Sequence, residues 1–84
     1  MRVTEKRIIN AMRHMHACKL SVRDTVRVDT VDGRKIAVYT LWSTDMVSLA
    51  DGSTVFVKLI SERNSWYGSR TTQSRLRAFG FYRQ

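Results

Sequence analysis

The fold is decided by residues 25–60, which read TVRVDTVDGRKIAVYTLWSTDMVSLADGSTVFVKLI. Runs of β-branched and aromatic residues alternate in this stretch with two Asp-Gly pairs, Asp32-Gly33 and Asp51-Gly52. An Asp-Gly pair supplies the positive φ angles that a tight hairpin turn requires. The stretch therefore predicts an antiparallel meander of four strands. The expected strands cover about residues 25–29, 35–42, 46–49 and 54–60.

The second of these strands is apolar on both faces. This pattern is typical of a central strand that a helix covers on one side and a loop or a partner covers on the other. Side chains alternate along a strand, so Tyr39 and Leu41 share one face and Ile36 and Val38 share the other. Periodicity does not decide which face the helices cover. A chain of 84 residues buries only a thin core, so burying more apolar surface would stabilise it. A homodimer that packs through the uncovered face of the sheet is therefore an additional expectation.

A helix is expected before the sheet, over about residues 4–19. Apolar residues recur there at three- and four-residue spacing, which is the pattern of one helix face. These residues are Ile8, Met12, Met15 and Cys18. Thr4 can act as the N-cap, because its hydroxyl can accept a hydrogen bond from a backbone N–H of the first turn.

A second, shorter helix is expected after the sheet. Residues 61–70 are too polar and too interrupted for a strand and predict a loop. Thr71 or Thr72 can then cap a helix that Gly80 ends, because glycine tolerates the left-handed conformation at a helix C-terminus. The whole chain thus predicts one small α+β domain, residues 1–84, with both helices packed on one face of the four-stranded meander.

The charge of the chain is concentrated at its two ends. With 15 Lys and Arg against 7 Asp and Glu, the formal net charge is +8. Residues 1–20 and residues 61–84 each carry five basic residues and one acidic residue, whereas the five basic and five acidic residues of 21–60 cancel. This asymmetry indicates an acidic partner that binds at the ends of the chain.

Several classes of protein are not expected from this sequence. No run of about 18 apolar residues exists that could span a membrane, and the N-terminus lacks the apolar stretch of a secretory signal. A single cysteine, Cys18, excludes an internal disulfide framework and fits the reducing cytoplasm. His14, His16 and Cys18 have no second Cys/His pair with which to complete a zinc site, so no metal is expected.

Enzymatic activity is not expected either. The sequence has no Gly-x-Ser-x-Gly nucleophile elbow, no spacing that indicates a pair of carboxylates and no glycine-rich phosphate loop. We therefore expect neither catalytic residues nor a cofactor.

The most informative surface candidate lies in the basic C-terminal end. Its residues are Arg63, Trp66, Tyr67, Arg70, Arg75 and Arg77, and Arg83 could extend it. Arginine holds phosphates through forked hydrogen bonds, and aromatic faces stack on unpaired bases. The set predicts a non-enzymatic nucleic-acid-binding protein. The alternative for the two aromatic residues is that they plug one end of the thin core while the arginines are solvated.

The stretch from Leu41 to Phe79 resembles a small domain found in many bacteriophage proteins. The residues that carry the resemblance are Leu41-Trp42-Ser43, Val47, Asp51-Gly52, Trp66, Ser69-Arg70-Thr71-Thr72, Leu76 and Phe79. Such domains pair a short meander with a Ser-x-Thr-Thr turn that starts a helix. Here Arg75 stands where the pattern has a histidine, and Arg77 where it has an asparagine. No catalytic residue carries over from the resemblance.

The resemblance implies a small phage protein that acts in the host cytoplasm. Two functions are then expected, namely binding of nucleic acid or inhibition of a host defence or housekeeping protein. In the second case the same arginines would meet an acidic protein surface, and Trp66 would be the anchor residue.

Overall fold

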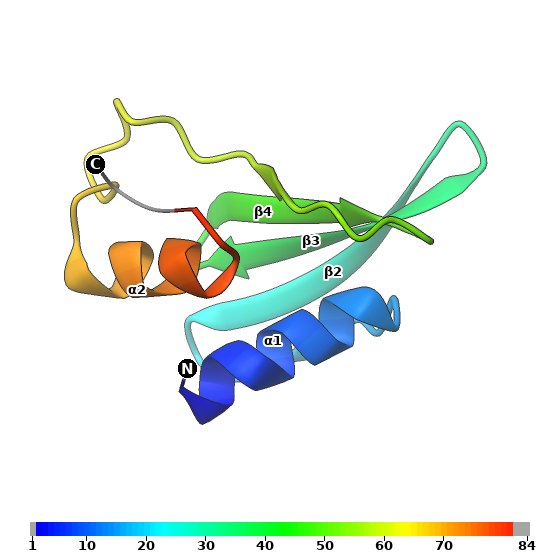
Figure 1. The fold of residues 1–84 in the computed structure, drawn as a ribbon, viewed down its shortest axis with the longest axis horizontal. Coiled ribbons are helices and arrows are strands. Elements are labelled where there is room, and N and C mark those ends of the chain that lie inside the picture. The colour runs from blue at the N-terminus through cyan, green and yellow to red at the C-terminus, as the bar shows by residue number, and fades with distance from the viewer. Residues whose placement is uncertain (1, 82–84) are drawn as a thin grey trace.

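The structure is a computed structural model that describes residues 2–81, and it has the expected α+β architecture (Figure 1). In this part of the chain, two helices accompany one antiparallel sheet of five strands, whose order in the sheet follows the order in the sequence. The elements are α1 (Val3–Arg13), β1 (Cys18–Lys19), β2 (Asp24–Val31), β3 (Arg34–Leu41), β4 (Thr44–Ala50), β5 (Val57–Lys58) and α2 (Arg70–Ala78).

Both Asp-Gly pairs form turns, but only Asp32-Gly33 forms the expected tight hairpin, since residues 53–56 separate Asp51-Gly52 from β5. Asp32 and Gly33 have φ angles of 52° and 77° and connect β2 to β3, with Val31 paired to Arg34 across the turn. Gly52 has a φ of 77° and follows β4. The positive φ angles are reached without strain at the glycines, which have no Cβ.

A β-bulge interrupts the pairing of β3 with β4. Tyr39 pairs with Val47, whereas Thr40 pairs with Asp45, so Met46 is an extra residue on β4. A bulge bends its strand and re-aims the side chains beside it. Met46 and Val47 are consecutive residues and yet are both buried in the core.

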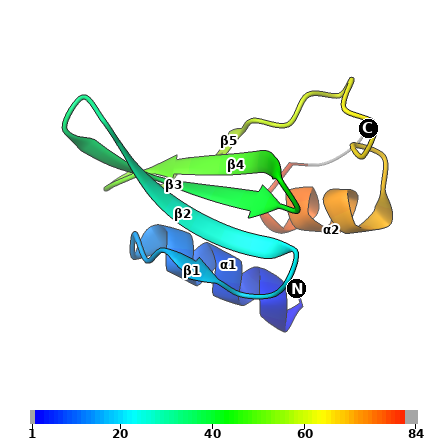
Figure 2. The same ribbon diagram turned by 180° about the vertical axis from the view of Figure 1, so that it is seen from behind.

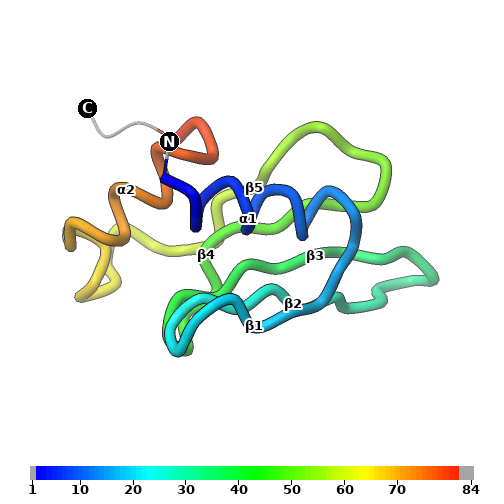
Figure 3. Tube along the Cα trace, turned by 90° about the horizontal axis from the view of Figure 1, so that it is seen from below, coloured from blue at the N-terminus to red at the C-terminus, as the bar shows by residue number. Residues whose placement is uncertain are grey.

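The helices cover the sheet face that carries Tyr39 and Leu41, which settles the choice that periodicity left open. Both residues belong to the buried cluster that includes Ile8 and Met12 of α1 and Leu76 of α2. α1 contacts β2 and β3, and Figure 3 views the molecule from the side on which α1 lies. In Figures 1 and 2, α2 lies at the end of the sheet where β3 ends, and the β2–β3 hairpin projects from the opposite end.

The N-terminal helix is shorter than predicted. It ends at Arg13, and Met15 follows with a φ of 48°, outside the helical range. Cys18 then belongs to β1, which pairs with the start of β2 and supplies a strand that the sequence did not predict. The predicted helix reaches residue 19 because Met15 and Cys18 continue the apolar spacing of Ile8 and Met12. Both residues do pack against the core, but from outside the helix. The N-cap is Arg2 and not Thr4.

The last predicted strand is also shorter than expected. Of residues 54–60 only Val57–Lys58 pair with β4. Val55, Val57 and Leu59 are exposed, while Phe56 and Ile60 pack against the core. Leu59 and Ile60 both donate backbone hydrogen bonds to the carbonyl of Met46 in β4, so the segment keeps the alternation of a strand beyond its two paired residues.

The C-terminal helix begins earlier than predicted. Its N-cap is Ser69, whose hydroxyl oxygen accepts a hydrogen bond from the backbone N–H of Thr72 at 3.1 Å, so neither Thr71 nor Thr72 is the cap. The helix ends at Ala78, and Gly80 follows with a φ of 91°, as expected for a glycine at a helix C-terminus. In residues 2–81, no helix is both long enough and apolar enough to cross a membrane.

Candidate nucleic-acid interface

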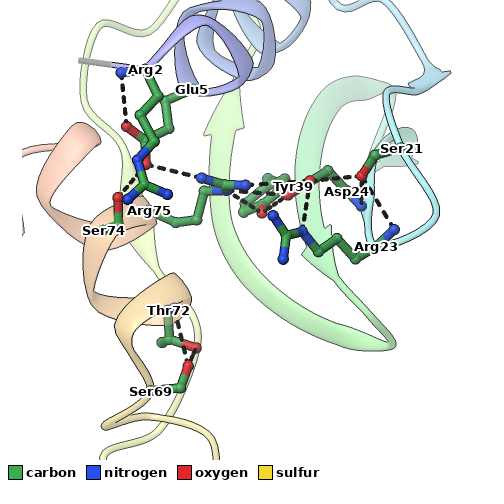
Figure 4. Close-up of polar contacts among 10 residues, drawn as sticks. All are labelled: Arg2, Glu5, Ser21, Arg23, Asp24, Tyr39, Ser69, Thr72, Ser74 and Arg75. Atoms are coloured by element: carbon green, nitrogen blue, oxygen red, sulfur yellow. Dashed lines mark hydrogen bonds and ion pairs between the residues drawn. The ribbon is translucent and has the colours of Figure 1, made fainter.

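Arg75 is not part of the surface, contrary to the prediction (Figure 4). Its exposure is 1%, and its guanidinium lies among acidic and phenolic groups. Nη1 donates to Glu5 Oε2 at 3.0 Å, and Nε lies 3.2 Å from both Asp24 Oδ1 and the Tyr39 hydroxyl. The phosphate-binding role predicted for Arg75 is therefore wrong, because its donors already bind two carboxylates of this chain.

The two carboxylates around Arg75 have further donors. Glu5 accepts from the Ser74 hydroxyl at 2.6 Å and from the backbone N–H of Arg2 at 3.2 Å. Burial raises the pKa of Glu5, but these bonds and the one from Arg75 outweigh it, so the pKa lies below its usual value. Through the ion pair of Arg75 with Glu5, the network joins α2 to α1. Within residues 2–81, no other buried ion pair connects these two helices.

Asp24 is held in the same way from the sheet side. It accepts from the Tyr39 hydroxyl at 2.5 Å and from the Ser21 hydroxyl at 2.7 Å. Burial raises the pKa of Asp24, and the hydrogen bonds from Tyr39, Arg75 and Ser21 lower it by more. Burial and the nearby carboxylate raise the pKa of Tyr39, so its hydroxyl stays a donor. This network therefore positions α2, with its other arginines, at the end of the sheet.

Arg70 and Arg77 lie on the exposed side of α2 and line one open cavity of about 930 Å³. Arg2, at the start of α1, lines the same cavity, although it is far from both in the sequence. None of the three makes an ion pair within residues 2–81. We call these three residues the arginine cluster. The carboxylate on this cavity, Glu5, is already paired with Arg75.

The two adjacent aromatic residues of the loop have different surroundings. Tyr67 packs against the core, and its hydroxyl accepts from Lys58 Nζ at 3.1 Å. Its backbone carbonyl accepts from Gln73 Nε2 at 2.6 Å. Trp66 is 68% exposed. The core-plugging alternative therefore describes Tyr67, and Trp66 is the aromatic residue that remains available at the surface.

The remaining candidates do not join the arginine cluster. Arg63 is exposed in the loop, where its backbone N–H bonds to Ser61, and it lines no cavity described here. Arg83 lies outside the described residues. Because α1 ends at Arg13, His14, His16 and Cys18 all lie outside the helix. Residues 2–81 contain no group of three or more His, Cys, Asp or Glu side chains placed to hold a metal.

Sequence reasoning missed two residues that the structure brings to this end of the molecule. Arg2 reaches the arginine cluster only through the packing of α1 beside α2. Trp42, in the turn between β3 and β4, lines a second cavity together with Trp66. An arginine and a tryptophan are residue types that bind nucleic acid. The residues that share a cavity with each of them, however, include ones far away in the sequence.

Comparison with known proteins gives no relative: no family model matches the chain, and neither a curated protein nor a solved structure is significantly similar to it. The likeness to a bacteriophage domain stays a prediction from the sequence.

Proposed function

We propose that this protein is a non-enzymatic nucleic-acid-binding protein and that the arginine cluster is its phosphate contact. One observation carries the proposal: arginines from the two ends of the chain line the same open cavity, and none is ion-paired within residues 2–81. Guanidinium groups bind phosphate through paired hydrogen bonds, and such contacts supply most of non-specific affinity for nucleic acid.

The absence of an ion pair distinguishes these arginines from Arg27 and Arg75. Arg27 is bound on the open face of the sheet by Asp45, at 2.6 and 2.9 Å, and by Asp29 at 3.1 Å. Arg75 is buried with its carboxylates. Other cations, such as Arg34 and Arg63, also make no ion pair within residues 2–81, but the three residues of the arginine cluster line one cavity. The exposed Trp66 adds a surface for stacking in the cavity next to it.

The proposal is tested by fluorescence anisotropy of labelled oligonucleotides, titrated with protein across a salt series. Arg70→Gln and Arg77→Gln should each lower the magnitude of the slope of log K against log salt by about one unit. Arg34→Gln is the matched control, because it removes the same charge from the exposed β2–β3 hairpin at the opposite end of the sheet. Unchanged slopes in both α2 variants contradict the proposal.

The alternative is that the same surface inhibits a host protein, with Trp66 as the anchor. It predicts a stoichiometric protein partner that survives nuclease treatment of a host lysate and is lost in Trp66→Ala. Oligonucleotide binding that disappears at modest salt, together with such a partner, would replace the nucleic-acid proposal with this one.

A further inference from the structure

A second cavity, of about 550 Å³, lies on the other side of the first turn of α2. Its floor is formed by Leu41, Met46 and Ile60, which are buried. Its walls include Trp42 and Trp66, which are 66% and 68% exposed. Figure 2 shows how the turn between β3 and β4, which carries Trp42, comes to lie beside α2. The volume is in the range of cavities that bind small molecules.

The backbone of Trp42 is held in an unfavourable conformation. Its φ is 56°, in the left-handed region, where a bulky side chain is an outlier and glycine or asparagine is preferred. The backbone N–H of Trp42 donates to the carbonyl of Arg23 at 2.7 Å, which fixes the turn. The exposed indole adds little burial to offset this strain. The two-residue loop between the paired residues Leu41 and Thr44 itself requires a positive φ, so the unusual feature is that a tryptophan occupies a position that favours glycine.

Hydroxyl groups surround this apolar cavity. Ser43, Thr44 and Thr71 line it, and their side chains make no hydrogen bond to other residues of the described range 2–81. Ser69 and Thr72, in contrast, bond to each other at 2.8 Å. An apolar cavity with aromatic walls and a few free hydroxyls fits a flat ring that carries hydrogen-bonding groups on its edge.

The two cavities share a wall. Gly68 and Arg70 line the arginine side, and Ser69 and Thr71 line the tryptophan side, so successive residues alternate between them. Consecutive Cα atoms are about 3.8 Å apart. A ligand with an aromatic ring on one side of this wall would therefore place a neighbouring group on the other side, within reach of cationic side chains.

We infer that this second cavity, the tryptophan cavity, holds one unpaired nucleobase in contact with both Trp42 and Trp66, while the adjoining phosphates contact the arginine cluster. This inference rests on the proposed function and adds the class of ligand, which is single-stranded nucleic acid. A base within a duplex is unavailable unless it is flipped out of the stack. A proline-rich peptide or a sugar could fill an aromatic cavity, but neither carries the negative charge that the arginines next to it would bind.

The test compares a fluorescently labelled single-stranded oligonucleotide with the same oligonucleotide made abasic, on the wild-type protein and on Trp42→Gly. Wild type should bind the normal strand about 10-fold more tightly than the abasic strand, from one stacked base. Trp42→Gly should lose this preference and keep the salt slope. Because glycine relieves the positive φ, the variant should be at least as stable as wild type, which separates lost stacking from lost folding.

Trp66→Ala is the second variant, and it should show the same loss of preference. Equal affinity of wild type for the normal and abasic strands, with the salt slope intact, would overturn the nucleobase inference and leave the arginine cluster as the proposed phosphate contact. Retention of the preference in both tryptophan variants would overturn it as well. Failure of every oligonucleotide to bind would instead overturn the proposed function itself.

Discussion

Three arginines of one helix, Arg70, Arg75 and Arg77, have opposite surroundings. Arg75 is enclosed with Glu5 and Asp24, whereas Arg70 and Arg77 face an open cavity. Seven residues are close to two turns of an α-helix, so residues 70 and 77 share a face, and residue 75 lies on another one. One face of α2 thus completes the folded framework, and the other presents charge to a ligand.

This difference gives arginine two separate roles, which substitutions should distinguish. Removing a buried charge leaves its partners without compensation, and the free energy of unfolding falls steeply. Removing an exposed charge changes the surface potential and little else. Stability measurements should therefore separate residue 75 from residues 70 and 77, whereas the salt dependence of binding should single out 70 and 77.

The largest effect is expected for Arg75→Met. Glu5 and Asp24 would stay buried without their cation, and breaking a buried pair in this way costs about 3–5 kcal/mol. In a small domain that is a large part of the total stability. Urea unfolding followed by circular dichroism measures the loss, with Arg70→Met as the matched control. Equal stability of the two variants would contradict the division between the two faces of α2.

A smaller loss is expected for Tyr39→Phe. The ring would keep its packing against Phe79, at a centroid distance of 5.8 Å, while Asp24 would lose the hydroxyl that donates to it at 2.5 Å. Leaving a buried carboxylate short of one donor costs about 1–3 kcal/mol. Tyr67→Phe is the control, because within residues 2–81 that hydroxyl bonds only to the Lys58 ammonium. Urea unfolding should place the control close to wild type.

The same carboxylates predict an acid-dependent stability. The pKa values of Glu5 and Asp24 are lowered in the folded chain, so their contribution is complete above the ordinary carboxyl pKa of about 4. It is lost as the pH falls through the lower pKa values of the folded state. Urea midpoints measured from pH 7 to pH 2 should stay level and then fall below about pH 4. In Arg75→Lys the pKa values of the two carboxylates should be lowered less, so the fall should be smaller and should end at higher pH, whereas Arg34→Gln should follow wild type.

The sequence could predict the sheet from its two Asp-Gly turns, but could not predict the burial of Arg75. Its partners Glu5 and Asp24 are 70 and 51 residues away, and only the packed structure brings them together. Helical spacing would have separated Arg75 from Arg70 and Arg77, once the bounds of α2 were known. Arg2 and Trp42 gave no local signal, because each acquires its cavity from a distant segment.

The smallest effect on stability is expected for the double variant Arg70→Gln/Arg77→Gln. Both side chains are exposed, and surface substitutions usually change the free energy of unfolding by less than about 0.5 kcal/mol. Because the chain carries a net charge of +8, removing two like charges reduces self-repulsion, so any change should be a gain at low salt that shrinks as salt is added. Urea unfolding at two salt concentrations measures this. A loss comparable to that of Arg75→Met would mean that these arginines support the fold, and the distinction between the two faces of α2 would be lost.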